Sequence, residues 1–407
     1  MRPRSDADRA SDGNPVGWVC SAPVSDDALP LAGLKVLDFT QNLPGPYASF
    51  MLASLGAEVV KVEPPKGDPG RFMEPFFSFV NRGKRSVMLD LRDPASRPAL
   101  EALVERSDVL LEGFRPGVMK RLGADWETCR ALNPRLVYCS ISAFGQEGPR
   151  ASEPGHDLNL QALSGASWLE RDARGMPRGT VLPIADLSSS LVAVASICAA
   201  LASRGPEGEG HYLDVAMADA VVSWAHLWGR GVDLAAGARA QVERSPAAFA
   251  MRPLTAPLIA ILDRVKLYAM PHYGIYRCRD GEHVALGVVD EKHFWKGLCE
   301  VLGLRRLEGL PMPARIAAGP ALRPVLAAIL ATKPADHWLR ALEAAGVPAC
   351  AVLKPEEAAR EKQFLFRGLY DERGLARAPL PGATHLDAPA PKLGEHTEAL
   401  LRELGVA

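Results

Sequence analysis

Short apolar runs alternate with helix-length segments along the first 145 residues of the chain. The apolar runs predict strands at residues 34–39, 59–62, 86–91, 109–112 and 136–142. Helices are expected between them, at 47–55 and 95–106. A strand, a helix and a second strand within about thirty residues form a βαβ unit, whose strands are parallel. The repeated alternation therefore predicts an α/β fold with a doubly wound, Rossmann-like sheet.

The pattern changes in the second half of the chain. Two helices, at 186–203 and 216–234, are expected around a short strand at 211–215, and the stretch 235–265 shows no clear period. Apolar runs at 273–277 and 283–288 flank Asp280 and Gly281, a turn signal that predicts a β-hairpin. Helices are expected at 293–301, 321–331, 336–345 and 395–404, and a strand at 349–353 is expected to return to the first domain.

Composition narrows the class of protein. The 47 basic residues against 48 acidic ones leave a net charge of -1, so no field attracts a nucleic acid or an anionic membrane. No apolar run reaches the roughly 20 residues that span a bilayer. Residues 1–30 are polar and are expected to form a disordered extension. The seven cysteines are scattered without a C-x-x-C pair, which indicates a reducing, cytoplasmic location.

The usual motifs of phosphate, metal and nucleophile sites are missing. The first strand-to-helix crossover reads TQNLPGPYAS, with one glycine in place of the G-x-G-x-x-G dinucleotide fingerprint. The sequence also lacks a Walker A motif and a G-x-S-x-G nucleophile elbow. The nine histidines are dispersed, so no metal site is expected. A nucleotide-like fold is therefore expected to hold its ligand in another way.

Six motifs follow one another in a recognisable order. They are LKVLDFT…GPYASFMLASLGAEVVKVEPPKGDPGR, NRGKRSVMLDLRDP, LEGFRPGVMKRLG, PGHDLNLQALSG, PIADLSSS and GEGHYLDVAMADA. With these motifs the chain resembles the family III CoA-transferases, or CaiB/BaiF family, which includes the α-methylacyl-CoA racemases. The resemblance covers nearly the whole chain after residue 30.

The resemblance implies a particular architecture. Members have a large Rossmann-like domain built from both chain ends, a smaller α+β domain inserted between them, and two subunits that interlock as a homodimer. The expected parts are therefore a large domain over 31–230, a small domain with linkers over 231–345, and a return to the large domain with a C-terminal helix over 346–407.

Asp186 is the first candidate for catalysis. It lies between an apolar segment and a helix, where a helix N-cap is the plain structural interpretation. The resemblance implies instead that Asp186 is the catalytic aspartate. In the transferases this carboxylate attacks the acyl-CoA carbonyl, which forms a mixed anhydride and frees the CoA thiolate before the acceptor acid exchanges. A carboxylate at a helix N-terminus is expected to remain ionised, as a nucleophile requires.

His156 and Glu291 are two further catalytic candidates. A lone histidine in a loop is as readily a solvated or capping residue, but the 30-residue separation from Asp186 matches the two functional positions of the resembled family. Racemases carry histidine there, and His and Asp exchange the α-proton on opposite faces of the carbon. The resemblance aligns Glu291 loosely with a supporting glutamate, although an exposed carboxylate at a helix start is the plainer interpretation. Asp157 is expected to cap a helix or to orient His156.

The resemblance also implies where CoA binds. Phosphate groups call for Arg and Lys, preferably Arg as a bidentate partner. The resemblance places Gln41, Asn42, Leu43 and Pro44 along the pantetheine arm, Phe114 beside the pantetheine or the adenine, and Arg121, next to Leu122, in contact with CoA. Arg115 is a second candidate for that contact, and a basic cluster of Arg71, Arg82, Lys84 and Arg85 is a candidate for the nucleotide phosphates. A solvated loop is the alternative for that cluster.

Three functions remain open. The leading one is transfer of CoA from an acyl-CoA to a small carboxylic acid through Asp186, and the second is racemisation of a 2-methylacyl-CoA by His156 and Asp186. A non-catalytic acyl-CoA-binding protein is the third. The run 187–190 (LSSS) replaces the glycine-rich run of many racemases, and 235–270 lacks the glycine-rich flap of the best-studied transferases. The CoA thioester is expected as a substrate, with no permanently bound cofactor.

Overall fold

The computed structural model describes residues 29–170, 172, 176–205, 208–231 and 270–406. These residues form two compact units. The first unit lies within Met1–Ala225 and Ala359–Ala407, and the second lies within His226–Ala358. The second unit is continuous in sequence, whereas the first consists of two separate segments. The aperiodic stretch 235–265 and nearly all of the expected N-terminal extension lie outside the described residues.

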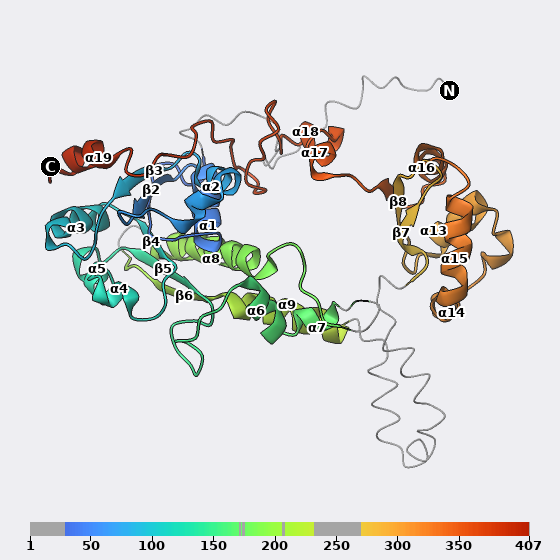
Figure 1. Ribbon diagram of the computed structural model, residues 1–407, viewed down its shortest axis with the longest axis horizontal. Helices are drawn as coiled ribbons and strands as arrows, with labels where there is room; N and C mark the ends of the chain where they lie inside the picture. Colours follow the sequence, from blue (N-terminus) through green and yellow to red (C-terminus); the bar gives the residue numbers. More distant parts are fainter. Residues whose placement is uncertain (1–28, 171, 173–175, 206–207, 232–269, 407) are drawn as a thin grey trace, which may run out of the picture. The chain divides into compact units, whose positions relative to one another are not determined.

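A six-stranded parallel sheet forms the centre of the first unit (Figure 1). Its strands are β1 (Lys35–Asp38), β2 (Glu58–Glu63), β3 (Arg85–Met88), β4 (Val109–Glu112), β5 (Val137–Ser142) and β6 (Tyr212–Ala216). They lie in the order β3-β2-β1-β4-β5-β6, and every neighbouring pair is parallel. The expected parallel sheet is therefore confirmed. The order reverses direction between β1 and β4, and ligands of such sheets bind where the carboxyl ends of those strands diverge.

Helices cover both faces of this sheet. The longer ones are α1 (Pro44–Ser54), α2 (Glu74–Asn81), α3 (Arg97–Glu105), α5 (Trp126–Leu132), α6 (Asp157–Leu163), α8 (Ile184–Arg204), α9 (Met217–Gly231) and α19 (Thr397–Leu404). Shorter ones are η3 (Pro69–Phe72), η4 (Pro94–Ser96), α4 (Val118–Arg121), α7 (Ala166–Leu169) and α18 (Lys362–Phe366). The last residues of α9 belong to the second unit.

Successive strand residues enter two different hydrophobic cores. Val36, Leu111 and Cys139 pack with α1 and α8, while Leu37 and Leu110 pack on the opposite face with α3, α5 and α19. Side chains of a strand alternate between its two faces, and both faces are covered here. This double burial explains why the strands read as continuous apolar runs.

Helix α8 is long and apolar enough to cross a membrane by length and composition alone. The expectation that no such segment exists was therefore wrong. The helix packs against α1, α6, β5 and β6, and its buried face carries Ser188, Ser189, Ala193 and Ile197. Small side chains on this face let α1 and α8 pack closely, so this is a core helix of the first unit.

The second unit has its own sheet and core. Its elements are β7 (Tyr273–Arg277), β8 (His283–Gly287), α13 (Lys292–Leu302), η6 (Arg305–Leu307), α14 (Met312–Ala317), α15 (Gly319–Leu330), α16 (Ala335–Ala344), β9 (Ala349–Ala351) and α17 (Pro355–Ala358). Strands β7 and β8 form the expected hairpin, and β9 pairs antiparallel with β8. The expected return of this strand to the first domain was therefore wrong, because β9 completes the sheet of the second unit.

Residues near the C-terminus cover the edge strand β3. The backbone N–H of Ser86 donates to Nδ1 of His396 at 3.2 Å, and that of Met88 donates to Oγ1 of Thr397 at 3.0 Å. In return, the N–H of His396 donates to the carbonyl of Ser86 at 2.9 Å. An uncovered edge strand offers its free N–H and C=O groups to other chains, so this segment protects the sheet.

Candidate active site

The implied CoA residues follow the two strands at which the sheet order reverses. Residues 41–44 come directly after β1, and residues 113–122 come directly after β4. The two connections are close together, since a Cβ atom at Gly113 would lie 3.7 Å from Cβ of Thr40. The sheet topology, which the sequence motifs do not contain, thus brings both groups to the crevice where this fold binds ligands.

The connection after β1 has a defined backbone shape. Helix α1 begins at Pro44 rather than at the expected Tyr47, because proline suits the first helical position, where no N–H is needed. Asn42 has a φ of 62°, and it is the only non-glycine residue with positive φ in the described part of the chain. Asparagine tolerates this left-handed conformation better than most residues do.

Two of the predicted arginines are free to bind an anion. Arg115 and Arg121 are exposed, and neither guanidinium has a hydrogen-bond or ion-pair partner among the described residues. Phe114 is half-buried, and its backbone N–H donates to Glu112 at 2.8 Å. Leu122 caps α4 and lines a shallow hollow with Arg92 and Arg97. The connection after β4 therefore presents unpaired positive charge beside apolar surface.

The basic cluster of the sequence prediction is engaged within the protein. Arg71 makes a bidentate pair with Glu63, at 2.7 and 2.6 Å, and its guanidinium lies over the ring of Phe77. Arg85 pairs with Glu58 and Glu403, and buried Arg82 donates to the carbonyl of Ala376.

Lys84 is fully buried and donates to Asp38, Ser49, Asn81 and the carbonyl of Pro46. Its burial does not fit the expected contact with a CoA phosphate. The sequence motif shows that residue 84 is a lysine, but it does not show that this lysine pairs with Asp38.

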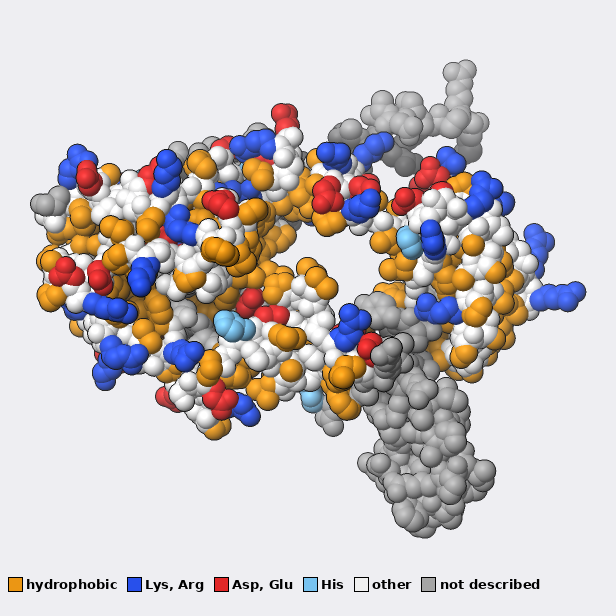
Figure 2. All heavy atoms as spheres, viewed as in Figure 1, with side chains coloured by type: hydrophobic (Ala, Val, Ile, Leu, Met, Phe, Trp, Pro, Cys, Tyr) orange, Lys and Arg blue, Asp and Glu red, His pale blue; other side chains and the backbone are white. Residues whose placement is uncertain are grey.

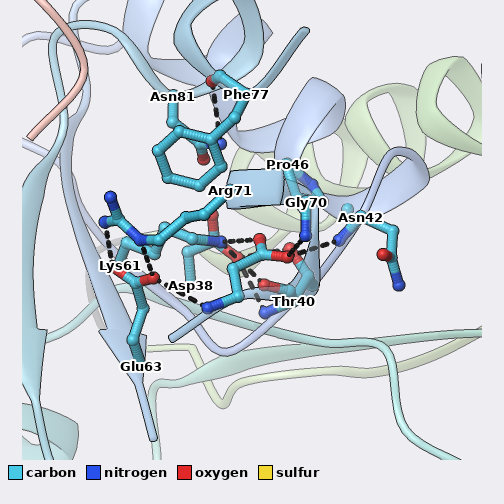
Figure 3. A network of polar contacts seen from close by, with 12 residues as sticks. Asp38, Thr40, Asn42, Pro46, Lys61, Glu63, Gly70, Arg71, Phe77 and Asn81 are labelled. Carbon is cyan, nitrogen blue, oxygen red and sulfur yellow. Dashed lines mark hydrogen bonds and ion pairs between the residues drawn. The ribbon is translucent and has the colours of Figure 1, made fainter. Parts of the chain in front are cut away.

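A buried ionic network lies beneath the connection after β1 (Figure 3). Lys84 pairs with Asp38 at 3.1 Å, and Lys61 pairs with Asp68 at 2.9 Å, with all four side chains fully buried. Burial would raise the pKa of Asp38, but Lys84 and Lys61 together hold it far below its usual range. Burial lowers the pKa of Lys84 to about 8, against the opposing effect of Asp38. The Asp38–Lys84 pair therefore remains ionised at neutral pH.

Asp186 is the third residue of α8. Pro183 is the N-cap, so Asp186 does not cap the helix, and its carboxyl group is partly buried. Burial, followed by the nearby charge of Asp157, raises the pKa of Asp186 to about 6. The helix terminus was expected to favour ionisation, but desolvation has the larger effect. Asp186 is thus ionised at neutral pH and yet poorly solvated.

Asp157 caps α8 rather than its own helix. Its Oδ1 accepts a hydrogen bond from the backbone N–H of Ala185 at 2.7 Å, and its Oδ2 accepts one from Nε2 of Gln161 at 2.5 Å. Buried Gln161 in turn accepts from the backbone N–H of Thr180 at 2.9 Å. The sequence did not single out Gln161, and its only signal was a polar residue one helical turn after Asp157.

His156 and Asp186 lie in one corner of the first unit. His156 is the exposed N-cap of α6, and its backbone N–H donates to Oδ1 of Asn159 at 3.1 Å. Each candidate is adjacent in sequence to one member of the Asp157–Ala185 hydrogen bond. That bond brings together two residues which the chain separates by 30 positions.

Glu291 belongs to the second unit and is the N-cap of α13. Its Oε2 accepts from the backbone N–H of Val289 at 3.0 Å. Hydrogen bonds from backbone N–H groups, its own and that of Val289, lower the pKa of Glu291. The side chain of Glu291 thus lies at the start of a helix as an exposed carboxylate, which is the alternative to a catalytic role.

A buried serine connects the helix of Asp186 to the connection after β1. Oγ of Ser190 lies 2.7 Å from the carbonyl oxygen of Pro44 and 2.8 Å from that of Asp186. Ser190 is part of the LSSS run that departs from the glycine-rich pattern. In this structure the serine hydroxyl joins the first turn of α8 to the first turn of α1.

Comparison with known proteins decides the family. The family model described as CoA-transferase family III matches residues 31–397. The chain belongs to CoA-transferase family III. One relative, acetyl-CoA:oxalate CoA-transferase of Acetobacter aceti, is 34% identical over 397 residues, covering 92% of this chain and 95% of the relative.

Other matches include a racemase and a solved structure. Alpha-methylacyl-CoA racemase of Homo sapiens is 32% identical over 391 residues, covering 92% of this chain and 93% of the racemase. The crystal structure of a CAIB/BAIF family protein from Brucella suis matches with a TM-score of 0.77 and 30% identity, covering 92% of this chain and 99% of that one. The resemblance drawn from the six motifs is therefore confirmed.

Proposed function

We propose that this family III enzyme transfers CoA from an acyl-CoA to a small carboxylic acid, with Asp186 as the nucleophile. The observation that carries the proposal is the partly buried carboxylate of Asp186, joined through Ser190 to the connection at the ligand crevice. Three matched relatives are named as CoA-transferases that act on oxalate, glutarate or mesaconate. They support a small carboxylic acid as acceptor.

The proposed reaction balances without a cofactor. The Asp186 carboxylate attacks the thioester carbonyl and the C–S bond breaks. CoA leaves as a thiolate, and the acyl group remains on Asp186 as a mixed anhydride. The thiolate attacks the aspartyl carbonyl, releasing the donor acid and leaving an aspartyl thioester. The acceptor carboxylate then forms a second anhydride by displacing the thiolate. Attack of the thiolate on the acceptor carbonyl yields the new acyl-CoA and restores Asp186.

The environment of Asp186 suits these steps. A carboxylate with a pKa of about 6 is mostly ionised at pH 7, and partial burial removes water that would otherwise stabilise its charge. In the first turn of α8 the N–H of Ala185 is bonded to Asp157, but those of Ile184 and Asp186 have no partner among the described residues and are available to stabilise the oxyanion of each tetrahedral intermediate. The unpaired guanidinium groups of Arg115 and Arg121 would hold the phosphates of CoA.

We also propose that the enzyme is an interlocked homodimer in which the second unit is an inserted small domain. We propose a cytoplasmic location for it. Several large apolar side chains of the first unit are exposed, among them Trp168 (62%), Val181 (100%) and Trp224 (49%). Exposed apolar residues of this size are typical of a surface that another chain covers. On the face in Figure 2, acidic and basic side chains are interspersed rather than gathered by sign. Light scattering on the purified protein would measure the oligomeric state.

Racemisation of a 2-methylacyl-CoA is the second candidate. The observation that favours it is the placement of His156 in the same corner as Asp186, together with the match to the human racemase. The imidazole of His156 and the carboxylate of Asp186, whose pKa is raised, could exchange the α-proton.

One experiment separates the two reactions. The protein is incubated with a 2-methylacyl-CoA in deuterated water, with and without oxalate or succinate. Transfer predicts a new acyl-CoA only when the acid is present, and hydroxylamine should then trap Asp186 as a hydroxamate. Racemisation predicts deuterium at C2 without any acid, and the His156→Gln variant should lose that exchange. Exchange without transfer would overturn the leading proposal.

The transfer rate is expected to fall on the acid side of pH 6. Because burial and Asp157 raise the pKa of Asp186 to about 6, the nucleophile is lost as the pH falls through that value. The rate constant kcat/KM should then drop about tenfold for each further pH unit. A pH–rate profile of the wild-type enzyme measures this limb. A limb near pH 4 would show that Asp186 is solvated as an ordinary carboxylate.

A further inference from the structure

The connection after β1 rests on the carboxylate of Asp68. Oδ1 of Asp68 accepts hydrogen bonds from the backbone N–H groups of Asn42, at 3.0 Å, and Gly70, at 2.7 Å. Oδ2 forms the ion pair with Lys61 at 2.9 Å. Asp68 itself is held in place, since its backbone N–H donates to Oε2 of Glu63 at 3.0 Å. Figure 3 labels its partners Asn42, Lys61, Glu63 and Gly70, which lie around this network of polar contacts.

The contact with Asn42 stabilises an unfavourable backbone conformation. Left-handed φ values are costly for residues other than glycine and persist where the surroundings enforce them. Here the enforcing group is a fully buried carboxylate bonded to the N–H of the residue with φ 62°. A charge-assisted hydrogen bond of this kind is stronger than one between neutral groups.

The other end of the connection is held by the same network. Nζ of Lys61 donates to the carbonyl of Thr40 at 2.8 Å, and Asp38 accepts from both the N–H and the hydroxyl of Thr40. The residues on both sides of Gln41 are therefore fixed by buried charges. Gln41 itself is only partly buried and is presented to the crevice on a fixed backbone.

We propose that Asp68 is a positioning residue for CoA: through the N–H of Asn42 it shapes residues 41–44 before the thioester arm arrives. The inference rests on the proposed function, because it assumes that these residues contact CoA. A preformed connection spares the ligand the free energy of ordering it, which strengthens binding without touching the reacting atoms. Asp68 thus acts on affinity for CoA, while Asp186 acts on the chemical step.

The Asp68→Asn variant tests this inference. Asparagine has one acceptor oxygen, which the ammonium group of Lys61 attracts, so its NH2 group faces the N–H of Asn42 and that hydrogen bond is lost. The expected result is a rise of about tenfold in the KM for acyl-CoA and in the Kd for free CoA, with kcat and the KM for the acceptor acid within about twofold of wild type. A merely structural role would lower the active fraction, and hence kcat, and leave both CoA constants unchanged.

Asp108→Asn is the matched control. Asp108 also accepts from a backbone N–H, that of Lys35 at 3.0 Å, and pairs with a basic side chain, Arg204, at 3.0 Å. It precedes β4 and therefore lies at the opposite end of the sheet from the ligand crevice. The control should lose stability without any change in the CoA constants.

A milder variant covers the case in which Asp68→Asn does not fold. Gly70→Ala leaves every charge in place, but its new Cβ atom would lie 3.1 Å from Oδ1 of Asp68 and 3.6 Å from Cα of Asn42. It should raise the Kd for CoA about threefold, whereas Gly309→Ala, which meets nothing within 4 Å, should not. Unchanged CoA affinity in both test variants overturns the role of Asp68. Failure of the wild type to bind CoA would instead overturn the proposed function.

Discussion

Replacing Asp186 with asparagine is expected to reduce the rate of CoA transfer by at least about a thousandfold. The amide cannot attack the thioester carbonyl, and within the corner formed by α6 and α8 no other described carboxylate occupies its position. Asp157 lies nearby, but both of its oxygens are engaged, by the N–H of Ala185 and by Gln161. The measurement is kcat for CoA transfer in the variant and in the wild type.

Two controls make this result specific. Asp219 is also an acidic residue in the first turn of its helix, α9, and is exposed, so Asp219→Asn should keep wild-type kcat. The Asp186→Asn protein should still bind free CoA with wild-type affinity. Transfer at more than about a tenth of the wild-type rate would show that Asp186 is not the nucleophile.

The same substitution should make the protein more stable at pH 7. The pKa of Asp186 is about 6 in the folded protein, against an ordinary value of 3.8 for an aspartate, so between these pH values the folded protein holds the proton more readily than the unfolded chain does. Stability therefore falls as the pH rises from about 4 to 6. Asparagine removes that loss, and thermal unfolding at pH 7 should show a higher midpoint than the wild type has.

Replacing Asp38 with asparagine is expected to lower the free energy of unfolding by about 3 kcal/mol. The carboxylate is fully buried, pairs with Lys84 and accepts from Ser49 and Thr40. Without it, the ammonium group of Lys84 is left in the interior with too little compensating charge. Urea unfolding at pH 7 measures the loss. The deficit should shrink as the pH rises toward 8, because the unpaired Lys84 of the variant loses its proton at a lower pH than the paired Lys84 of the wild type, whose pKa is about 8.

The Lys84→Met variant and the double variant complete this test. If the two charges stabilise each other, Asp38→Asn with Lys84→Met should be more stable than the sum of the two single losses predicts. Additive losses would contradict the coupling. The Lys84→Met variant also addresses the sequence-based expectation for this lysine: an increase in the Kd for CoA without a loss of stability would support phosphate binding.

The local pattern of apolar and polar residues was sufficient to predict where most strands of the first unit lie. It was not sufficient to predict which segments pair with one another in space. Each of the six strands contains an apolar segment, because both faces of the sheet are covered, so their positions could be predicted to within a few residues. Strand β9 could not be assigned, because a three-residue apolar segment carries no sign of which sheet it joins. Helix α1 was placed too late because its first turn contains two prolines, which usually mark a break.

The candidate site was predictable as a set of residues but not as an arrangement. Motif order alone identified His156 and Asp186, yet only the folded chain shows that Asp157 connects their helices. Arg71 and Lys84 were expected to be free because a sequence shows charge without showing the partner. Arg115 and Arg121 could not be distinguished from them until the structure showed which basic side chains lack a carboxylate.

The cover over β3 has a consequence for the order in which the protein folds during synthesis. The second unit is continuous and can fold as soon as residue 358 has left the ribosome, since its sheet needs no later segment. All six strands of the first unit are synthesised before residue 217. The edge strand at Ser86 and Met88 nevertheless stays uncovered until His396 and Thr397 emerge from the ribosome. Loss of only the last dozen residues would leave that edge open permanently, so a C-terminally truncated chain should aggregate even though every strand is present.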